Sequence, residues 1–149
     1  MEKPKLDFIG LQYYSDPLLN LLRGSVARTP DQDLTSYDYR TYPQGLSSAI
    51  EECSTLGVPI DLTEIGIDIG INQGDLDDTR RIRYFNRIFQ VVEKALEEGK
   101  EVRSLYFWTL IDNLEWHKGW TIPFGLYSRT PEGEIKPRGM TTWLQNLES

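Results

Sequence analysis

The chain has 149 residues, of which 39% are hydrophobic and 26% are charged, and its formal net charge is −7. This composition is typical of a globular domain, and the acidic balance argues against nucleic acid or an anionic membrane as a partner, because both require a basic surface. The sequence holds no apolar run near the ~18 residues of a membrane span, and residues 1–7 lack a signal-peptide core. With one cysteine and one histidine, we expect a single cytoplasmic unit over residues 1–149, without a metal or cofactor.

The N-terminal quarter predicts a strand followed by a long connection. Residues 6–14 are rich in strand-forming side chains, and Gly10 in their middle indicates close backbone packing. A turn at residues 15–17 ends the strand. Residues 18–42 show no sustained periodicity and indicate a long loop or a short hairpin, a feature that is more often functional or disordered than incidental.

Three helices are predicted from apolar residues at three- and four-residue spacing. The first opens at residues 42–45 and is capped by Gly57; its apolar face carries Leu46, Ala49, Ile50 and Cys53, with Cys53 as a buried structural thiol. The second covers residues 78–98 and stops at Gly99. The third covers residues 140–147. The apolar stripe of the second helix consists of Ile82, Phe85, Ile88, Phe89, Val92, Ala95 and Leu96.

Charged residues gather at the start of the second helix. For the arginines we expect a solvated face in preference to a phosphate site, and for the aspartates helix capping in preference to a metal site, since the spacing lacks the glycine and terminal glutamate of a calcium loop. The arginines are Arg80, Arg81, Arg83 and Arg87, and the aspartates are Asp75, Asp77 and Asp78.

Two further strands are predicted, at residues 58–64 and 102–110, each followed by polar residues. Glu64 is expected as the last residue of the first of them. The second runs into a cluster of Trp108, Asp112, Asn113, Glu115 and Trp116. Alternating strands and helices predict parallel strands with right-handed crossovers, and ligands bind at the carboxyl ends of such strands. Indoles beside carboxylate and amide groups favour a sugar ligand; the alternative is aromatic packing around a capped turn.

Three motifs, in order along the chain, resemble glycoside hydrolase family 1, the β-glucosidases. Residues 7–14 look like the family's sixth barrel strand, Leu62-Thr-Glu-Ile-Gly66 resembles its seventh-strand Thr-Glu-Asn-Gly motif, and residues 108–116 resemble its eighth-strand signature. Residues 124–126 and 136–143 also fit the family's C-terminus. The resemblance implies an α/β fold that corresponds to the last three βα units, strands 6–8, of a TIM (β/α)8 barrel. Residues 1–149 would then be one C-terminal fragment.

The resemblance assigns roles to individual residues. Glu64 would be the nucleophile that attacks the anomeric carbon, and Tyr14 would orient its carboxylate. Trp108 would form the floor under the sugar, and Glu115 and Trp116 would bind the outer hydroxyls. Outside the family context, Glu64 would be an ordinary surface acid.

Other positions refine the expected substrate. Phe124 would line the pocket, while Gln12 and Ile65 stand where the family usually has asparagine. Relatives that act on phosphorylated sugars generally lack a carboxylate at the position of Glu115, which would repel a phosphate. The resemblance therefore implies unphosphorylated β-glucosides or β-galactosides.

One of the two carboxyl groups of a retaining glycosidase has no counterpart in the sequence. The family's acid/base glutamate lies in an Asn-Glu-Pro motif of the fourth strand, and no such motif occurs here. We therefore expect the isolated chain to be inactive, with an exposed apolar inner sheet face. Activity would need an N-terminal half-barrel chain or, through self-association, a second copy. The alternative is a non-catalytic remnant that binds sugar or serves as a structural fragment.

Overall fold

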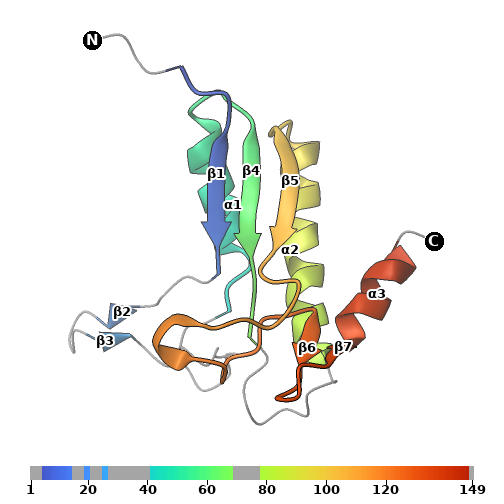
Figure 1. Cartoon of the computed structure of the whole chain (residues 1–149). Coiled ribbons are helices and arrows are strands. Elements are labelled where there is room, and N and C mark those ends of the chain that lie inside the picture. The colour runs from blue at the N-terminus through green and yellow to red at the C-terminus, as the bar shows by residue number, and fades with distance from the viewer. Residues whose placement is uncertain (1–4, 15–18, 21–24, 27–40, 69–77, 148–149) are drawn as a thin grey trace.

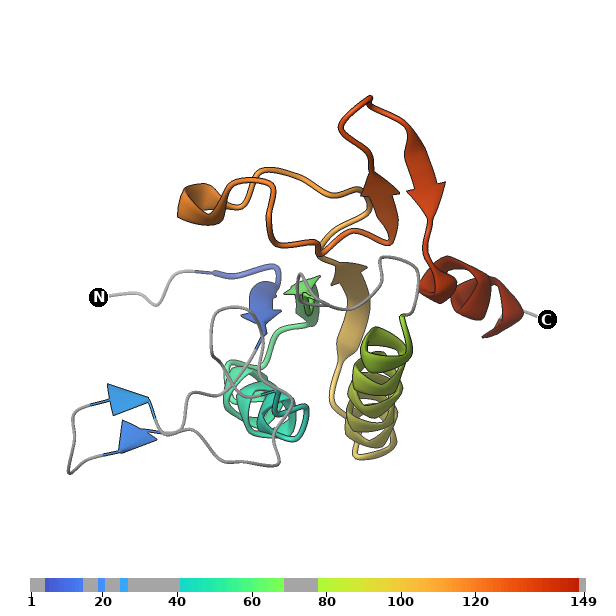
Figure 2. The ribbon, with the colours of Figure 1, turned by 90° about the horizontal axis from the view of Figure 1, so that it is seen from below.

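The computed structural model describes residues 5–14, 19–20, 25–26, 41–68 and 78–147. Its centre is a parallel sheet of three strands in the order β1 (Ile9–Tyr13), β4 (Ile60–Ile65) and β5 (Val102–Phe107). Helices α1 (Gly45–Ser54) and α2 (Thr79–Glu97) cover one face of this sheet (Figure 1, Figure 2). The architecture is thus an open α/β layer in the described part of the chain, and not a closed barrel.

The helices and the sheet bury one apolar layer between them. Phe85 of α2 packs against Phe107 of β5 with ring centroids 4.8 Å apart, and Phe89 stacks on Trp143 at 5.7 Å. Each fully buried aliphatic or aromatic side chain stabilises the fold by about 1.5–3 kcal/mol. The fully buried apolar side chains are Leu46, Ile50, Ile60, Leu62, Ile65, Ile67, Phe85, Ile88 and Met140.

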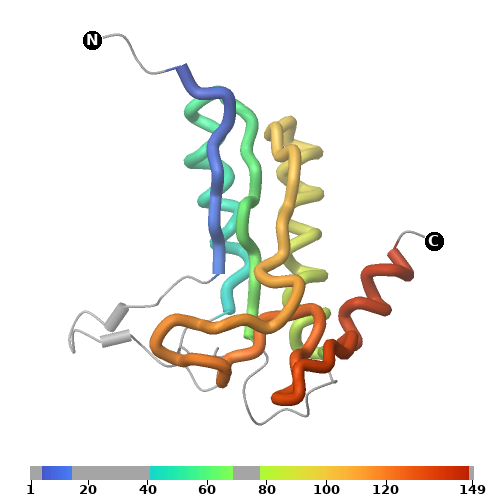
Figure 3. Tube along the Cα trace, in the orientation of Figure 1, coloured from blue at the N-terminus to red at the C-terminus, as the bar shows by residue number. Residues whose placement is uncertain are grey.

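The remaining elements follow the sheet at its carboxyl edge. After β5 the chain turns past the carboxyl ends of the strands, on the side of the sheet away from α1 and α2, and forms the short helix η1 (Trp116–Lys118), as Figure 2 and Figure 3 show. It then forms the antiparallel pair β6 (Tyr127–Arg129) and β7 (Ile135–Pro137) and ends in α3 (Gly139–Leu147). The strands β2 (Leu19–Asn20) and β3 (Ser25–Val26) pair antiparallel.

The predicted strands and helices are present with shifted ends. The strand expected over 102–110 stops at Phe107, because its partner β4 ends at Ile65, and the residues after Trp108 pair with residues 124–127 instead. The strand expected to end at Glu64 continues to Ile65. The pair β6 and β7 was not predicted. Most of the loop predicted over residues 18–42 lies outside the described residues.

The charges at the start of α2 differ from the prediction. Arg83 and Arg87 are exposed as expected, but Arg81 is only 1% exposed and points inward. Asp78 precedes the helix without a side-chain capping bond, and its Oδ2 accepts from the amide of Met140 at 2.9 Å. The solvated-face and capping predictions are therefore wrong for these two residues. Asp75 and Asp77 lie outside the described residues.

The prediction of an exposed apolar sheet face is also wrong. Side chains that alternate with the core residues on β4 and β5 are mainly polar, and Arg103 holds Asp61 through two hydrogen bonds of 3.1 and 2.6 Å. Ser104 donates a third bond to Asp61 at 2.9 Å. Tyr106 is the exposed aromatic residue of β5, at 59%. The open face is consequently closer to a solvated or hydrogen-bonding surface than to an apolar one.

Two smaller observations complete the comparison with the sequence. Cys53 is half-buried, packs against the core, and has its thiol pKa raised by burial, so the expected fully buried thiol is only partly so. Among the described helices, none has both the length and the apolar character needed to span a membrane.

Candidate active site

The site is built around Glu64, near the carboxyl end of β4. Tyr14, the residue after β1, donates its phenolic proton to Glu64 Oε2 at 2.6 Å. Burial raises the pKa of Tyr14, and its bond to Glu64 raises it further. Tyr14 therefore remains a protonated donor throughout the physiological pH range, and Glu64 is held in one orientation by it.

Strand irregularities explain how Glu64 reaches this position. The pairing of β1 with β4 passes from Leu11↔Leu62 to Gln12↔Glu64, so β4 carries one extra residue. Along β4, Leu62 and Ile65 are buried, whereas the two residues between them are not. A bulge of this kind changes the direction of a side chain, and bulges are frequent next to active sites. The same register places exposed Gln12 opposite Glu64 in the sheet.

Trp108 and Glu115 form the second part of the site. The indole Nε1 of Trp108 donates to Glu115 Oε1 at 3.0 Å, and Glu115 is only 5% exposed. The amide of Trp108 donates to the carbonyl of Ile65 at 2.8 Å, which attaches this segment to the end of β4. The peptide bond between Trp108 and Thr109 is cis. Glu115 also contributes to the raised pKa of Tyr14, so the two parts are electrostatically coupled.

Gly66 lies where the site segments meet. A Cβ atom on Gly66 would lie 2.4 Å from the Trp108 carbonyl oxygen, 3.1 Å from Tyr14 and 3.2 Å from Phe124. Phe124 is buried and meets the Tyr14 ring edge-on, with centroids 6.0 Å apart. Only glycine fits this position without displacement. The signal for Gly66 in the sequence was its place two residues after Glu64, at the end of the Thr-Glu-Ile-Gly motif.

Two residues of the predicted polar cluster behave differently from the others. Trp116 is 88% exposed, has a positive φ of 42°, and presents its indole to solvent. Asp112 binds Arg138, whose Nη2 donates to its Oδ2 at 2.7 Å. Its Oδ1 accepts from the amide of Gly125 at 2.8 Å. Asp112 is thus a structural member of the cluster, which the sequence grouped with ligand-binding residues.

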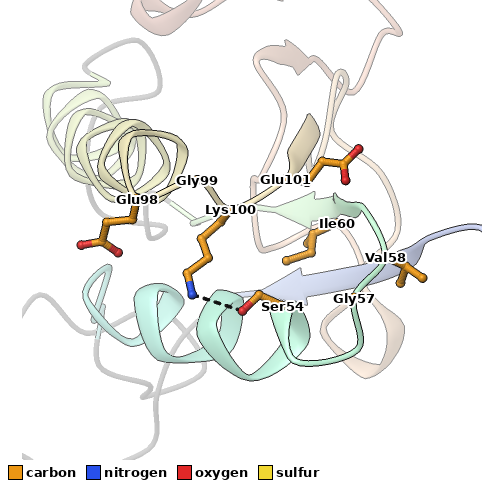
Figure 4. Close-up of a pocket in the computed structure, with 8 residues that line it drawn as sticks. All are labelled: Ser54, Gly57, Val58, Ile60, Glu98, Gly99, Lys100 and Glu101. Atoms are coloured by element: carbon orange, nitrogen blue, oxygen red, sulfur yellow. Dashed lines mark hydrogen bonds between the residues drawn. The ribbon is translucent and has the colours of Figure 1, made fainter.

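A hollow of about 370 Å³ lies at the opposite end of the sheet (Figure 4). It is formed where α1 and α2 end and where β4 and β5 begin, and Lys100 donates there to Ser54 at 3.3 Å and pairs with Glu51 at 2.5 Å. None of the site residues lines it. Nor does the described part of the chain bring together three histidine, cysteine, aspartate or glutamate side chains that could hold a metal ion.

A comparison with known families decides the membership of the chain. The model of glycosyl hydrolase family 1 matches residues 3–148. The chain belongs to this family. The β-galactosidase of Pyrococcus woesei is 33% identical over 124 residues, and the β-glucosidase A of Thermotoga maritima is 29% identical over 156 residues. These alignments cover 83% and 96% of this chain but only 22% and 34% of the relatives.

Solved structures give the same result. The Thermotoga maritima β-glucosidase in complex with deoxynojirimycin superposes with a TM-score of 0.83 at 25% identity, over 97% of this chain and 35% of that one. The 6-phospho-β-galactosidase of Clostridium acetobutylicum, at 26% identity over 83% of this chain, shows that the relatives also include an enzyme named for phosphorylated sugars. The chain spans about a third or less of the length of these relatives.

Proposed function

We propose that this chain supplies the nucleophile half of a retaining β-glycosidase, corresponding to strands 6–8 of the family barrel. The observation that carries the proposal is the 2.6 Å hydrogen bond from Tyr14 to Glu64 at the carboxyl edge of the sheet. In a retaining mechanism a carboxylate attacks the anomeric carbon and forms a glycosyl-enzyme, which water then hydrolyses. Glu64 is the candidate for the attacking group.

Tyr14 prepares Glu64 for this step. A phenol that donates to one carboxylate oxygen restricts rotation of the carboxylate and leaves the other oxygen for the sugar. Because the pKa of Tyr14 is raised, its hydroxyl stays protonated at neutral pH and cannot act as a base. Tyr14 is therefore a positioning donor in the proposal.

Trp108 and Glu115 are the residues proposed to bind the sugar. The indole face suits the C–H surface of a pyranose, and its Nε1 fixes Glu115 Oε1, so that the carboxylate faces the sugar hydroxyls in one orientation. A carboxylate in this place would repel a sugar phosphate. We propose unphosphorylated β-glucosides or β-galactosides as substrates, with Trp116, Phe124 and Gln12 completing the wall on this side.

The second carboxyl group must come from outside residues 1–149. A retaining glycosidase needs two carboxyl groups about 5–5.5 Å apart, and the sequence contains no Asn-Glu-Pro motif. General acid catalysis is worth about 10²–10⁴-fold in rate. The chain by itself is accordingly proposed to be inactive until an N-terminal barrel part completes the site.

Reconstitution tests the proposal directly. The chain is co-expressed with the N-terminal two thirds of a family 1 β-glucosidase that ends before its sixth strand, and hydrolysis of an aryl β-glucoside is measured. We expect activity with the wild type and with Glu101→Gln, which removes a carboxylate at the opposite edge of the sheet. We expect none with Glu64→Gln. Equal activity of Glu64→Gln would show that another group is the nucleophile.

A covalent trap tests the same assignment independently of rate. A 2-deoxy-2-fluoro aryl glucoside slows hydrolysis of the glycosyl-enzyme, so the reconstituted protein should gain one fluorosugar on the peptide that contains Glu64. A label on another carboxylate contradicts the assignment. Sugar binding by the lone chain, without turnover after reconstitution, would instead favour the non-catalytic alternative.

A further inference from the structure

Five charged side chains are withdrawn from solvent beside the candidate site, and the proposed mechanism uses none of them. They come from the end of β4, the start of α2, the segment after β5 and the start of α3. Four are between 0% and 3% exposed as residues, and the fifth, Asp112, has a side chain 14% exposed. The five are Asp68, Asp78, Arg81, Asp112 and Arg138.

Two of these guanidinium groups converge on one backbone carbonyl. Arg138 Nη1 donates to the Gly125 oxygen at 2.7 Å, and Arg81 Nη1 donates to the same oxygen. Arg81 Nη2 adds a bond of 3.1 Å to the carbonyl of Pro123. Phe124 lies between these two carbonyls, so the pair of arginines fixes the backbone on both sides of a residue that touches Tyr14.

Asp112 connects the other side of the same segment. Arg138 holds its two oxygens at 3.0 and 2.7 Å, and Asp112 Oδ1 also accepts from the Gly125 amide. Backbone bonds join the two ends of the segment, from Leu126 to Thr109 and from Tyr127 to Leu110, each at 2.9 Å. The chain between Trp108 and Tyr127 is therefore a closed loop fastened at its base, and Glu115 projects from it.

We infer that Arg138 and Arg81 are positioning residues that fasten the loop of residues 109–126 so that Glu115 meets the Trp108 indole. Ion pairs that are buried in this way cost desolvation and often add little net stability, and their retention agrees better with a role in holding one arrangement. Arg81 belongs to α2 and Arg138 lies between β7 and α3, and the two helices α2 and α3 contact each other. Only the consequence for catalysis rests on the proposed function.

The four tryptophans of the chain provide a direct measurement. Each indole N–H gives one resonance in a ¹⁵N-labelled sample, and Trp108→Phe identifies the one of interest. In Arg138→Lys, which keeps the charge but loses the two-pronged geometry, we expect the Trp108 indole resonance to move and its hydrogen exchange to accelerate at least ~10-fold. A change in global stability alone leaves the native-state resonance in place.

Arg103→Lys is the matched control, because Arg103 also holds an aspartate through two bonds, but on the open face of β5. It should leave the Trp108 resonance and its exchange unchanged. An unchanged indole in Arg138→Lys, or an equal change in Arg103→Lys, would overturn the inference. Asp112→Asn, which removes the partner carboxylate without changing its size, should reproduce the effect of Arg138→Lys.

Hydrogen exchange in the wild-type protein tests whether the loop is fastened as one unit, even if the variants fail to fold. The fastened loop should open as one unit, so the Trp108 indole and the amides of Leu126 and Tyr127 should share one denaturant dependence of exchange. An indole that exchanges independently of these amides contradicts the inference. In the reconstituted enzyme, Arg138→Lys should raise KM about 5–10-fold with kcat changed less, because Glu115 is proposed to bind the sugar ring. The exchange experiments use no sugar. They can therefore contradict the role of Arg138 while the glycosidase proposal stands, and they can support that role even if the glycosidase proposal fails.

Discussion

Each end of the central sheet carries an arginine–aspartate ion pair, and the two pairs differ in burial and in what they bind. At the amino end, Arg103 and Asp61 form a two-pronged ion pair with side chains 43% and 15% exposed. At the carboxyl end, Arg138 and Asp112 form a similar pair with side chains 2% and 14% exposed, and Arg138 also holds a buried carbonyl. The first pair lies on a solvated face. The second ties down the segment that carries the candidate site, so the difference lies in what each pair fixes.

Glu64 and Glu101, the two glutamates of the reconstitution test, also lie at opposite ends of the sheet. Glu64 accepts from a half-buried tyrosine at the carboxyl edge, whereas Glu101 lines the hollow at the amino edge. Position relative to the strand ends separates a candidate catalytic carboxylate from an ordinary one, because the loops that bind a ligand follow the carboxyl ends of parallel strands.

The largest expected effect is on catalysis at the carboxyl edge. In the reconstituted enzyme, Glu64→Gln should lower kcat for an aryl β-glucoside by at least ~10³-fold, because the amide is a poor nucleophile. Glu101→Gln should leave kcat at the wild-type value. A loss of similar size in both variants would mean that the two ends of the sheet do not differ in the proposed way.

The next effect concerns the two ion pairs. Arg138→Met removes a guanidinium group whose side chain is only 2% exposed, together with its bonds to Asp112 and to the Gly125 carbonyl, and we expect a loss of about 3–5 kcal/mol in the free energy of unfolding. Arg103→Met should be hard to distinguish from the wild type, since that pair is solvated. Urea unfolding monitored by far-UV circular dichroism measures both. Equal losses would contradict the distinction between the two pairs.

Gly10 in β1 and Gly66 just after β4 extend the comparison to packing. Gly66→Ala forces a methyl group against the Trp108 carbonyl, and overpacking of this kind costs about 1–3 kcal/mol. A Cβ on Gly10 would lie 3.2 Å from a movable methyl group of Thr63, so Gly10→Ala should cost less. The same urea titration tests this order, and a larger loss for Gly10→Ala would reverse it.

The smallest effect is a dependence on alkaline pH. Burial raises the pKa values of Tyr14 and Tyr84 above the ordinary value of about 10. The folded state then keeps protons that the unfolded chain loses, so this contribution to stability is complete below about pH 10 and declines as pH rises further. Tyr84→Phe should weaken the fall in urea midpoint between pH 9 and pH 11. Tyr106→Phe, which changes an exposed tyrosine, is the control and should leave that fall as it is.

Local pattern was sufficient for the main elements of the fold and for the motif residues. The period of apolar residues placed α2 and α3 within one residue of their observed ends and located α1 between residues 42 and 57, since a helix buries one face at a fixed repeat. The motif around Glu64 and the one from Trp108 to Trp116 identified the side chains that meet at the carboxyl edge. Arg81 could also have been found, because it precedes Phe85 and Ile88 by four and seven positions on the same buried face.

Other features depend on contacts between segments far apart in the chain. The bulge that places Gln12 beside Glu64 is a property of two strands in register, and no repeat within either strand shows it. The partner of Asp112 is Arg138, 26 residues away, and only the folded loop brings the two together. The sequence by itself thus determined the elements and the family, through periodicity and local motifs. The tertiary structure decided which charges are buried and what they fasten, because burial and pairing are properties of the packed chain.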